Sequence, residues 1–348
     1  MALSQVCSGY EKIKLSLDRN LESKNNDSAL YFINKIPKQE GICELEYLTH
    51  KIKYYFNVTN YDSAFVLLKE LDQKLAKNPV IKNKIQLQHL YGQYYYYSSL
   101  TDSASWYFLK TLELSEQHAD TTMQIRALSS LGNTFANLKQ FDKALEYANK
   151  ALALCITTKN KKTEIYLLGN IMTFYGRYYT KTHNASYLDS AETCSKRLIA
   201  EAKKHNKKYE LLKAYSVLGS CYFSAKKFDL TLLYSDSILL VADREMHLRP
   251  ITQAYGNICD SYLELGLNKK AKPAADSALV YALKLNDVST IADSYYRLYD
   301  CENMLGNYRN ALMYFQKYSS LNDSLKSEDQ IQTVNELEQK YSKAKNEK

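Results

Sequence analysis

The feature that most constrains this chain is a small residue that recurs at nearly constant spacing. Each occurrence follows a polar or aromatic turn, and the eight positions are Ala29, Ala64, Ala104, Ala144, Ala191, Thr231, Ala271 and Ala311. The successive spacings are 35, 40, 40, 47, 40, 40 and 40 residues. A period of this length is typical of arrays in which each repeated unit packs only on its neighbours. We call these eight residues the anchors.

Aromatic residues and glycines repeat in step with the anchors. Glycine stands twelve residues before three of them, at Gly92, Gly132 and Gly219. Aromatic residues recur nine residues before and three residues after the anchor, as Phe135 and Tyr147 do around Ala144. Apolar residues between positions 127 and 138 follow an i, i+3, i+4, i+7 pattern, and a second amphipathic stretch covers 144–154. The repeated unit is therefore predicted to be a helical hairpin.

The composition favours an all-α fold and excludes several classes of enzyme. Glycine (10) and proline (4) together make up about 4% of the 348 residues, against roughly 12% in average usage. Sandwiches, barrels and doubly wound folds need many turns built from these two residues. The sequence also has no GxGxxG, GxxxxGK[ST], GxSxG or HExxH pattern, which excludes the nucleotide-binding and hydrolase classes that carry these motifs.

One segment carries a family resemblance. Leu131-Gly132-Asn133, Phe135, Phe141-Asp142-Lys143-Ala144-Leu145-Glu146-Tyr147 and Ala151-Leu152 together resemble the tetratricopeptide repeat (TPR). The resemblance implies an all-α, right-handed α-solenoid of about eight TPR-like hairpins over residues 1–320. This unit has 40 residues instead of 34, which predicts that each helix is longer by under one turn. The 47-residue step predicts either a longer loop or a lengthened helix pair near residues 178–187.

Two other patterns predict details of the helices. Residues 321–348 carry a single apolar stripe in a charged background and predict a C-terminal charged helix, either a cap or the start of a coiled coil. The tripeptide Asp-Ser-Ala recurs at Asp27, Asp62, Asp102, Asp189 and Asp276. We expect these Asp or Ser side chains to cap the starts of helices. The same tripeptide also resembles an O-glycosylation acceptor of exported bacterial proteins.

Residue types with catalytic potential are dispersed. The seven cysteines include no CxxC pair and are predicted to be small buried side chains without disulfides. The six histidines include no i, i+4 pair that could hold a metal ion on one helix face. The sequence therefore predicts no metal, no cofactor, no catalytic residue and a protein that is not an enzyme. A catalytic site in the irregular segment 178–187 is the alternative left open.

The TPR resemblance also implies a binding surface. In that family, the first helix of each hairpin lines a concave groove that takes an extended peptide or a partner helix. Carried onto this sequence, the partner-binding residues are Gln86, His89, Gln93, Tyr96, Tyr97, Arg126, Ser129, Asn133, Asn137, Lys213, Ser216, Ser220 and Phe223, continued by Asp260 and Glu264. The run Tyr94–Tyr97 sweeps about 300° of a helix, so at least one of its rings should be exposed. The family's carboxylate clamp is not transferred, because it needs Lys where Ser129 stands.

The lengthened repeats and Asp-Ser-Ala tripeptides resemble the repeat region of bacterial sensor kinases and transcriptional regulators. This implies a non-catalytic protein- or peptide-binding module, the sensory or interaction region of a bacterial membrane-anchored signalling regulator. A cytoplasmic assembly scaffold or chaperone adaptor is the alternative. A signal peptide before Ala2 and an apolar span after Lys348 in the uncut gene would favour the sensor, and native ends would favour the scaffold.

The charge and the termini bear on partners and location. The net charge of +8 is spread over a large surface, and lysines gather at 159–162 and 203–208. We expect these lysines to lie at helix ends, so nucleic acid is not an expected partner, whereas self-association is. Residues 2–5 resemble the end of a secretory signal and favour a periplasmic or extracytoplasmic location. Unmatched cysteines point the other way, so the compartment stays open. Any membrane contact would use segments absent from this sequence.

Overall fold

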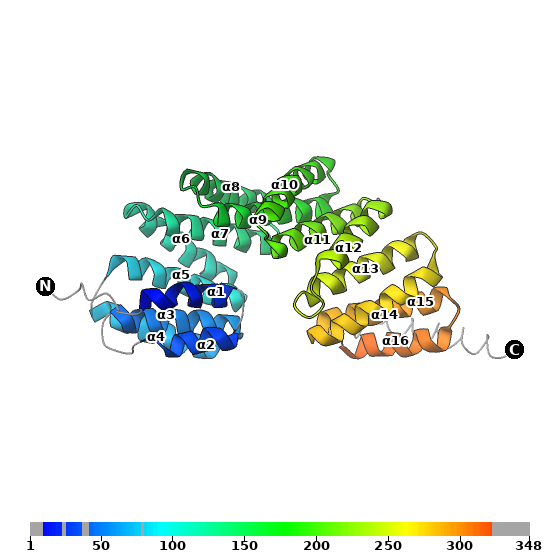
Figure 1. Ribbon diagram of the computed structural model, residues 1–348, viewed down its shortest axis with the longest axis horizontal. Coiled ribbons are helices and arrows are strands. Elements are labelled where there is room, and N and C mark those ends of the chain that lie inside the picture. The colour runs from blue at the N-terminus through cyan, green and yellow to red at the C-terminus, as the bar shows by residue number, and fades with distance from the viewer. Residues whose placement is uncertain (1–9, 23–25, 37–41, 78–79, 322–348) are drawn as a thin grey trace. The chain divides into compact units, whose positions relative to one another are not determined.

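The structure is a computed structural model that describes residues 10–22, 26–36, 42–77 and 80–321 (Figure 1). Within these ranges every regular element is an α-helix, as the sequence predicts. The protein divides into two compact units, residues 1–160 (unit 1) and 161–348 (unit 2). The predicted charged helix at 321–348 falls almost entirely outside the described residues.

Each unit contains four helical hairpins. Unit 1 consists of α1 (Tyr10–Glu22), α2 (Asn26–Asn34), α3 (Ile42–Asn57), α4 (Tyr61–Lys77), α5 (Ile81–Tyr97), α6 (Thr101–Gln117), α7 (Thr121–Asn137) and α8 (Phe141–Thr157). Unit 2 consists of α9 (Lys161–Thr182), α10 (Ala185–Lys204), α11 (Lys208–Ser224), α12 (Phe228–Val241), α13 (Leu248–Glu264), α14 (Asn268–Leu285), α15 (Val288–Met304) and α16 (Tyr308–Leu321). In every hairpin the odd-numbered helix comes first and the even-numbered helix comes second.

Helix length explains the unusual repeat period. From α5 to α8 each helix has 17 residues, and three-residue turns separate them. Two such helices and two such turns account for the period of 40. The 47-residue step arises because α9 has 22 residues and α10 has 20, joined through His183 and Asn184. Of the two alternatives for this step, the lengthened helix pair is therefore the one that is found.

The anchors lie where the two helices of a hairpin meet. All eight have no solvent-exposed surface. The aromatic residues that repeat with them stack across the same hairpin, with ring centroids 5.2 Å apart for Tyr95 and Tyr107 and 5.4 Å apart for Phe135 and Tyr147. Tyr222 and Tyr234 repeat this stack in unit 2 at 5.5 Å. Such stacked pairs stabilise beyond the area they bury, so the sequence repeat records one helix-to-helix contact made many times.

The turns between helices use left-handed residues that are mostly not glycine. In the turn after α7, Lys139 has φ 58°, and its N–H donates to the Ala136 carbonyl at 3.1 Å. The next N–H, of Gln140, donates to the Phe135 carbonyl at 2.9 Å, which completes a Schellman motif. Gly266 and Gly306 fill the equivalent position in two later turns. The low glycine content thus reflects strained residues at most turns as well as few turns.

The Asp-Ser-Ala tripeptides do not form the predicted caps. Asp102 is the second residue of α6, and the N-cap residue of that helix, Leu100, makes no capping bond through its side chain. In α4 the Ser63 N–H is instead accepted by the Asn60 side chain at 3.1 Å. Other residues outside the tripeptides, such as Asp120 at α7, also cap helices with their side chains. In the first turn of α6, Asp102 still interacts favourably with the helix dipole.

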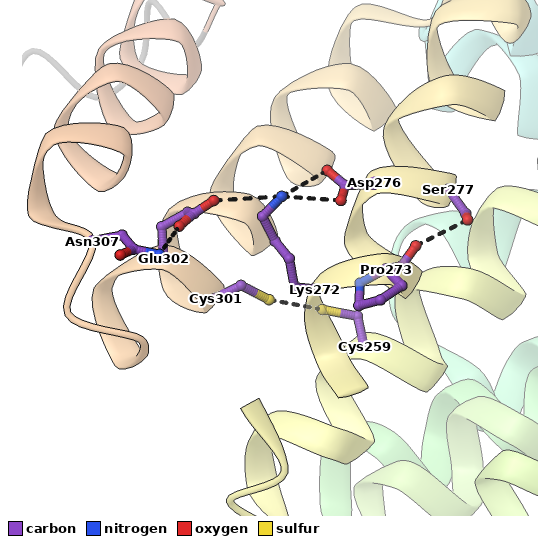
Figure 2. A network of polar contacts seen from close by, with 8 residues as sticks. All are labelled: Cys259, Lys272, Pro273, Asp276, Ser277, Cys301, Glu302 and Asn307. Atoms are coloured by element: carbon purple, nitrogen blue, oxygen red, sulfur yellow. Dashed lines mark hydrogen bonds and ion pairs between the residues drawn. The ribbon is translucent and has the colours of Figure 1, made fainter. Parts of the chain in front are cut away.

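Most of the described cysteines are buried, as predicted. Cys155, Cys221, Cys259 and Cys301 are buried and Cys194 is half-buried, and none of the five forms a disulfide. Figure 2 shows the Cys259 and Cys301 Sγ atoms facing each other between α13 and α15, 3.6 Å apart. These thiols fill the position that glycine or a small residue holds in other first helices.

A buried carboxylate ties the last two hairpins together. Glu302 on α15 is 4% exposed, and its Oε2 accepts a hydrogen bond from Asn307 Nδ2 at 2.7 Å. Its other oxygen lies 3.4 Å from Lys272 Nζ on α14, and Lys272 also donates to Asp276 (Figure 2). Because both oxygens are paired, the buried charge is compensated.

We predict that Gly92→Ala destabilises unit 1. A Cβ at this position would lie 2.5 Å from two ring atoms of Phe108, which is 1% exposed and has no room to move. Overpacking of this kind costs about 1 to 3 kcal/mol. Urea denaturation would measure the loss. Gly169→Ala is the matched control, since its Cβ would lie 3.5 Å from the nearest atom, and equal losses for both variants would contradict the prediction.

We also predict that Ala119→Gly stabilises the protein. Ala119 has φ 53°, a conformation that costs an L-residue roughly 1 to 2 kcal/mol and glycine very little. Part of this gain is offset by the greater entropy of glycine in the unfolded state, which leaves about 0.5 to 1 kcal/mol. The midpoint of urea denaturation would report it. Ala153→Gly, in the exposed face of α8, should instead lower the midpoint.

Candidate functional site

One face of the first helices carries the predicted binding residues. Counted back from the anchor, the face consists of the residues at 18, 15, 11 and 7 positions, which form one stripe along a helix. We call it the first-helix face. Nine of the thirteen predicted residues lie on α5 and α7 of unit 1: Gln86, His89, Gln93, Tyr96, Tyr97, Arg126, Ser129, Asn133 and Asn137. The other four, Lys213, Ser216, Ser220 and Phe223, lie on α11 of unit 2.

In unit 1 the structure brings the ends of α5 and α7 together. Asn137 Nδ2 donates a hydrogen bond to the Tyr96 hydroxyl at 2.8 Å. Tyr97 is 43% exposed, which confirms that at least one ring of the tyrosine run faces solvent. Its ring also packs against Tyr61 and Phe56, with centroids 6.1 and 5.5 Å away. Tyr97 therefore contributes to folding as well as to the surface.

Three predicted contact residues are buried instead of exposed. Ser129 and Ser216 are 8% and 9% exposed, and His89 is 7% exposed. The His89 ring lies 5.3 Å from the Phe108 ring, and its Nδ1 has no hydrogen-bond partner among the described residues. Burial, followed by the charges of Arg126 and Lys53, lowers the pKa of His89 to about 3. The imidazole is therefore neutral at physiological pH.

Lys53 on α3 belongs to the same face, although the sequence prediction omitted it. It stands 11 residues before Ala64, as Gln93 and Asn133 do before their own anchors. Lys53 is half-buried, and its pKa is lowered by burial and by the charge of Arg126. The prediction began with the third hairpin; extending the repeat register back by one unit would have found this residue.

In unit 2 polar side chains link the first helices of successive hairpins. Lys213 Nζ on α11 donates to Asn170 Oδ1 on α9 at 2.9 Å. Gln253 Nε2 on α13 donates to Ser220 Oγ at 3.0 Å. Burial lowers the pKa of Lys213 to about 8, so this ammonium group is held at a cost in solvation. The first-helix face of unit 2 thus includes α9 and α13, which supplied no residue to the set of thirteen.

Several polar atoms on this face remain without partners. Asn170 Nδ2, Asn257 Nδ2 and Ser216 Oγ are buried and make no hydrogen bond within the described part of the protein. A buried donor that has lost water without gaining a partner costs about 1 to 3 kcal/mol. Such groups are rare in folded proteins, and each points to a ligand or water as its partner.

The end of the same face is acidic. Arg297 on α15 donates through Nε and Nη2 to both oxygens of Asp260 on α13, at 2.9 to 3.1 Å. Asp300, one turn further along α15, has no hydrogen bond to another described residue, and burial together with the charge of Asp260 raises its pKa to about 6. Asp260 is therefore engaged, whereas Asp300 is available.

The hollows near these residues are small or open. One beside Gln86, lined also by Glu46, Thr49 and Asn83, has a volume of about 10 Å³, enough for one water molecule. Another of about 200 Å³ lies against the second lysine cluster, at Lys203, Lys207 and Lys208. Among the described residues, no group of three or more His, Cys, Asp or Glu could hold a metal ion. Over the same ranges no helix has the length and apolar character needed to span a membrane.

The comparisons with known proteins identify the fold. No family model and no curated protein matches the sequence. Solved structures do match: a Rap protein complexed with Competence and Sporulation Factor has 14% identity and a TM-score of 0.62, over 96% of this protein and 99% of that one. The protein therefore has the fold of TPR-type helical-repeat proteins, as its sequence pattern indicates.

Two further structures extend this likeness. NprR in complex with its cognate peptide NprX has 14% identity and a TM-score of 0.57, over 98% of this protein and 99% of that one. Aspartyl phosphate phosphatase F from Bacillus subtilis has 15% identity and a TM-score of 0.58, over 93% of this protein and 96% of that one.

We predict that Asp300→Asn stabilises the protein at pH 7 but not at pH 4. The folded-state pKa of about 6 exceeds the ordinary value of 3.8, so between these values the folded state binds more protons than the unfolded state. Stability therefore falls as the pH rises through this window, and removing the carboxyl group removes about 1 to 3 kcal/mol of that fall. Chemical denaturation at both pH values would measure it. Asp236→Asn, on the exposed side of α12, should show no such difference.

Proposed function

We propose that this protein is a non-catalytic module that binds an extended peptide along its first-helix faces. The observation that supports this most strongly is the set of unpartnered buried polar atoms at Asn170, Asn257 and Ser216. An extended peptide presents unpaired backbone C=O and N–H groups at regular intervals. The Asn amides can donate to those carbonyls, and the binding energy would then include relief of their present desolvation cost.

The surrounding side chains suit a peptide better than a small metabolite. Gln93 and Asn133 add carboxamides to the unit 1 face, and Tyr97 adds an exposed aromatic ring. Rigid aromatic groups beside amide donors are common in peptide-recognition surfaces. Small-molecule sites are deeper, typically 300 to 1,000 Å³. Two proteins of this fold are solved as complexes: the Rap protein with Competence and Sporulation Factor, and NprR with its cognate peptide.

A non-catalytic role is favoured by the segment that was the candidate for a hidden active site. Residues 178–187 are not irregular: they join α9 to α10, and the rings of Tyr178 and Tyr187 stack with centroids 3.9 Å apart. One structural neighbour is nevertheless an aspartyl phosphate phosphatase. Turnover of a phosphorylated aspartate by this protein would contradict the proposal.

At a finer level, we propose that the module is the sensory region of a bacterial membrane-anchored signalling regulator. The lengthened hairpins support this, as does the fold shared with NprR, a quorum sensor that is solved with its cognate peptide. In the alternative, a cytoplasmic scaffold or chaperone adaptor, the faces would hold a permanent partner. A released and exchangeable peptide favours the sensor, and co-purification of a stoichiometric protein favours the scaffold.

We predict that Asn133→Ala weakens peptide binding at least tenfold. A displayed library of random peptides selected on the whole protein would supply the probes, and titration calorimetry would measure their affinities. Loss of one well-placed hydrogen bond to a peptide group costs about 1 to 1.5 kcal/mol, which corresponds to about tenfold in affinity.

Asn149→Ala is the matched control for this experiment. Asn149 is exposed on the second helix α8, so the same substitution there leaves the first-helix face intact. Circular dichroism would verify that both variants remain folded. Equal affinities of the two variants for every selected peptide would remove unit 1 from the binding surface.

A further inference from the structure

The first-helix face of unit 1 holds positive charge that the described part of the protein does not pair. Lys53 on α3 and Arg126 on α7 flank His89 on α5, so three successive first helices each contribute one nitrogen-bearing side chain. Neither Lys53 nor Arg126 forms an ion pair or hydrogen bond with another described residue. His89 Nδ1 is likewise buried without a partner in these ranges.

The acidic residues nearest to Lys53 are engaged elsewhere. Asp18 on α1 attracts Lys53, but its Oδ1 lies 3.3 Å from His50 Nε2. Glu46 on α3 also attracts Lys53, and one of its oxygens lies 3.8 Å from His50 Nδ1. These carboxylates moderate the charge at the Lys53 end, whereas no acidic residue counts among the groups that act on His89.

The three side chains interact electrostatically in the absence of any ligand. Burial lowers the pKa of Lys53, and the charge of Arg126 lowers it further. Both cations also act on the His89 imidazole, which burial keeps neutral. Two like charges without a counter-ion, one of them partly removed from water, destabilise the ligand-free protein. An anion placed between them would offset that cost.

His89 completes the arrangement as a neutral hydrogen-bond donor. A neutral imidazole can donate one N–H to an anion without adding a third positive charge to the cluster. Phe108 packs against its ring and holds the imidazole at the base of the face. The arrangement is therefore two cations at the sides and one fixed, buried donor group between them.

We propose that Lys53, His89 and Arg126 form an anion subsite that takes a carboxylate of the bound peptide. The proposal rests on the proposed function and specifies one group of its ligand. A singly charged carboxylate matches the cluster better than a doubly charged phosphate, because Asp18 and Glu46 lie near Lys53 and would repel the second charge. Gln93 and Asn133, in register with Lys53, are placed to bind peptide groups on either side.

The test follows the ammonium group of Lys53 directly. Reductive ¹³C-methylation of the whole protein keeps each lysine charged and gives it an NMR signal, and Lys53→Arg identifies the signal of Lys53. The first probe is acetate, titrated at constant ionic strength against sodium chloride. The Lys53 signal should shift and saturate, and in Arg126→Gln the saturable shift should be lost or need at least tenfold more acetate.

Lys82→Gln serves as the control, since Lys82 is an exposed cation near the start of α5. It should leave the Lys53 response unchanged. The subsite is refuted if acetate produces no saturable shift, or if Arg126→Gln responds like the unsubstituted protein. Inorganic phosphate saturating at a lower concentration than acetate would overturn the assignment to a carboxylate.

Three short peptides then identify the source of the carboxylate. They are Ac-Ala-Ala-Glu-Ala-Ala-NH₂, Ac-Ala-Ala-Ala-Ala-Ala-OH and the neutral Ac-Ala-Ala-Gln-Ala-Ala-NH₂. An acidic side group is assigned if the first shifts the Lys53 signal at the lowest concentration, and the carboxylate at the end of a peptide if the second does. An equal response to the neutral peptide contradicts the subsite. Since the acetate titration involves no peptide, it can succeed even if the proposed peptide-binding function fails.

Discussion

The whole structure depends on the close approach of two helices at a residue too small to keep them apart. Each anchor is completely buried, and the aromatic residues on either side stack across the gap. Gly92 shows how close this approach is, because even one added carbon would meet the Phe108 ring. Every hairpin repeats this contact with local partners. Stability is therefore distributed over the array instead of being concentrated in one core.

This constraint explains why the fold could be predicted from the sequence. A contact that needs a small residue at one position and an aromatic residue nine positions earlier leaves a periodic trace, and that trace is visible by inspection. The period also predicted longer helices, because a hairpin with short turns can absorb extra residues only in its helices. The capping prediction failed for a different reason. Asp and Ser in the first turn resemble an N-cap in sequence, but the three-residue turn places another residue, such as Asn60, at the cap.

The binding face was only partly predictable. The repeat register indicates which helix positions share a stripe, and the same register contains Lys53 even though the prediction did not extend to it. What the register does not contain is depth. His89 and Gln86 differ by one helical turn, yet His89 packs against Phe108 and is buried, whereas Gln86 borders a water-sized hollow. Pairings between hairpins, such as Arg297 with Asp260, depend on side-chain reach across helices and have no periodic signal.

The two kinds of position also differ in energetic role. The anchors and their aromatic partners lie in the gap within a hairpin, where packing is complete and every change of volume is costly. The first-helix face points away from that gap, so it can hold unsatisfied amides and unpaired cations without disturbing the stack. A protein built this way tolerates locally unfavourable groups because the hairpins on either side remain packed. The unpartnered atoms of Asn170, Asn257 and His89 therefore persist where a ligand can satisfy them.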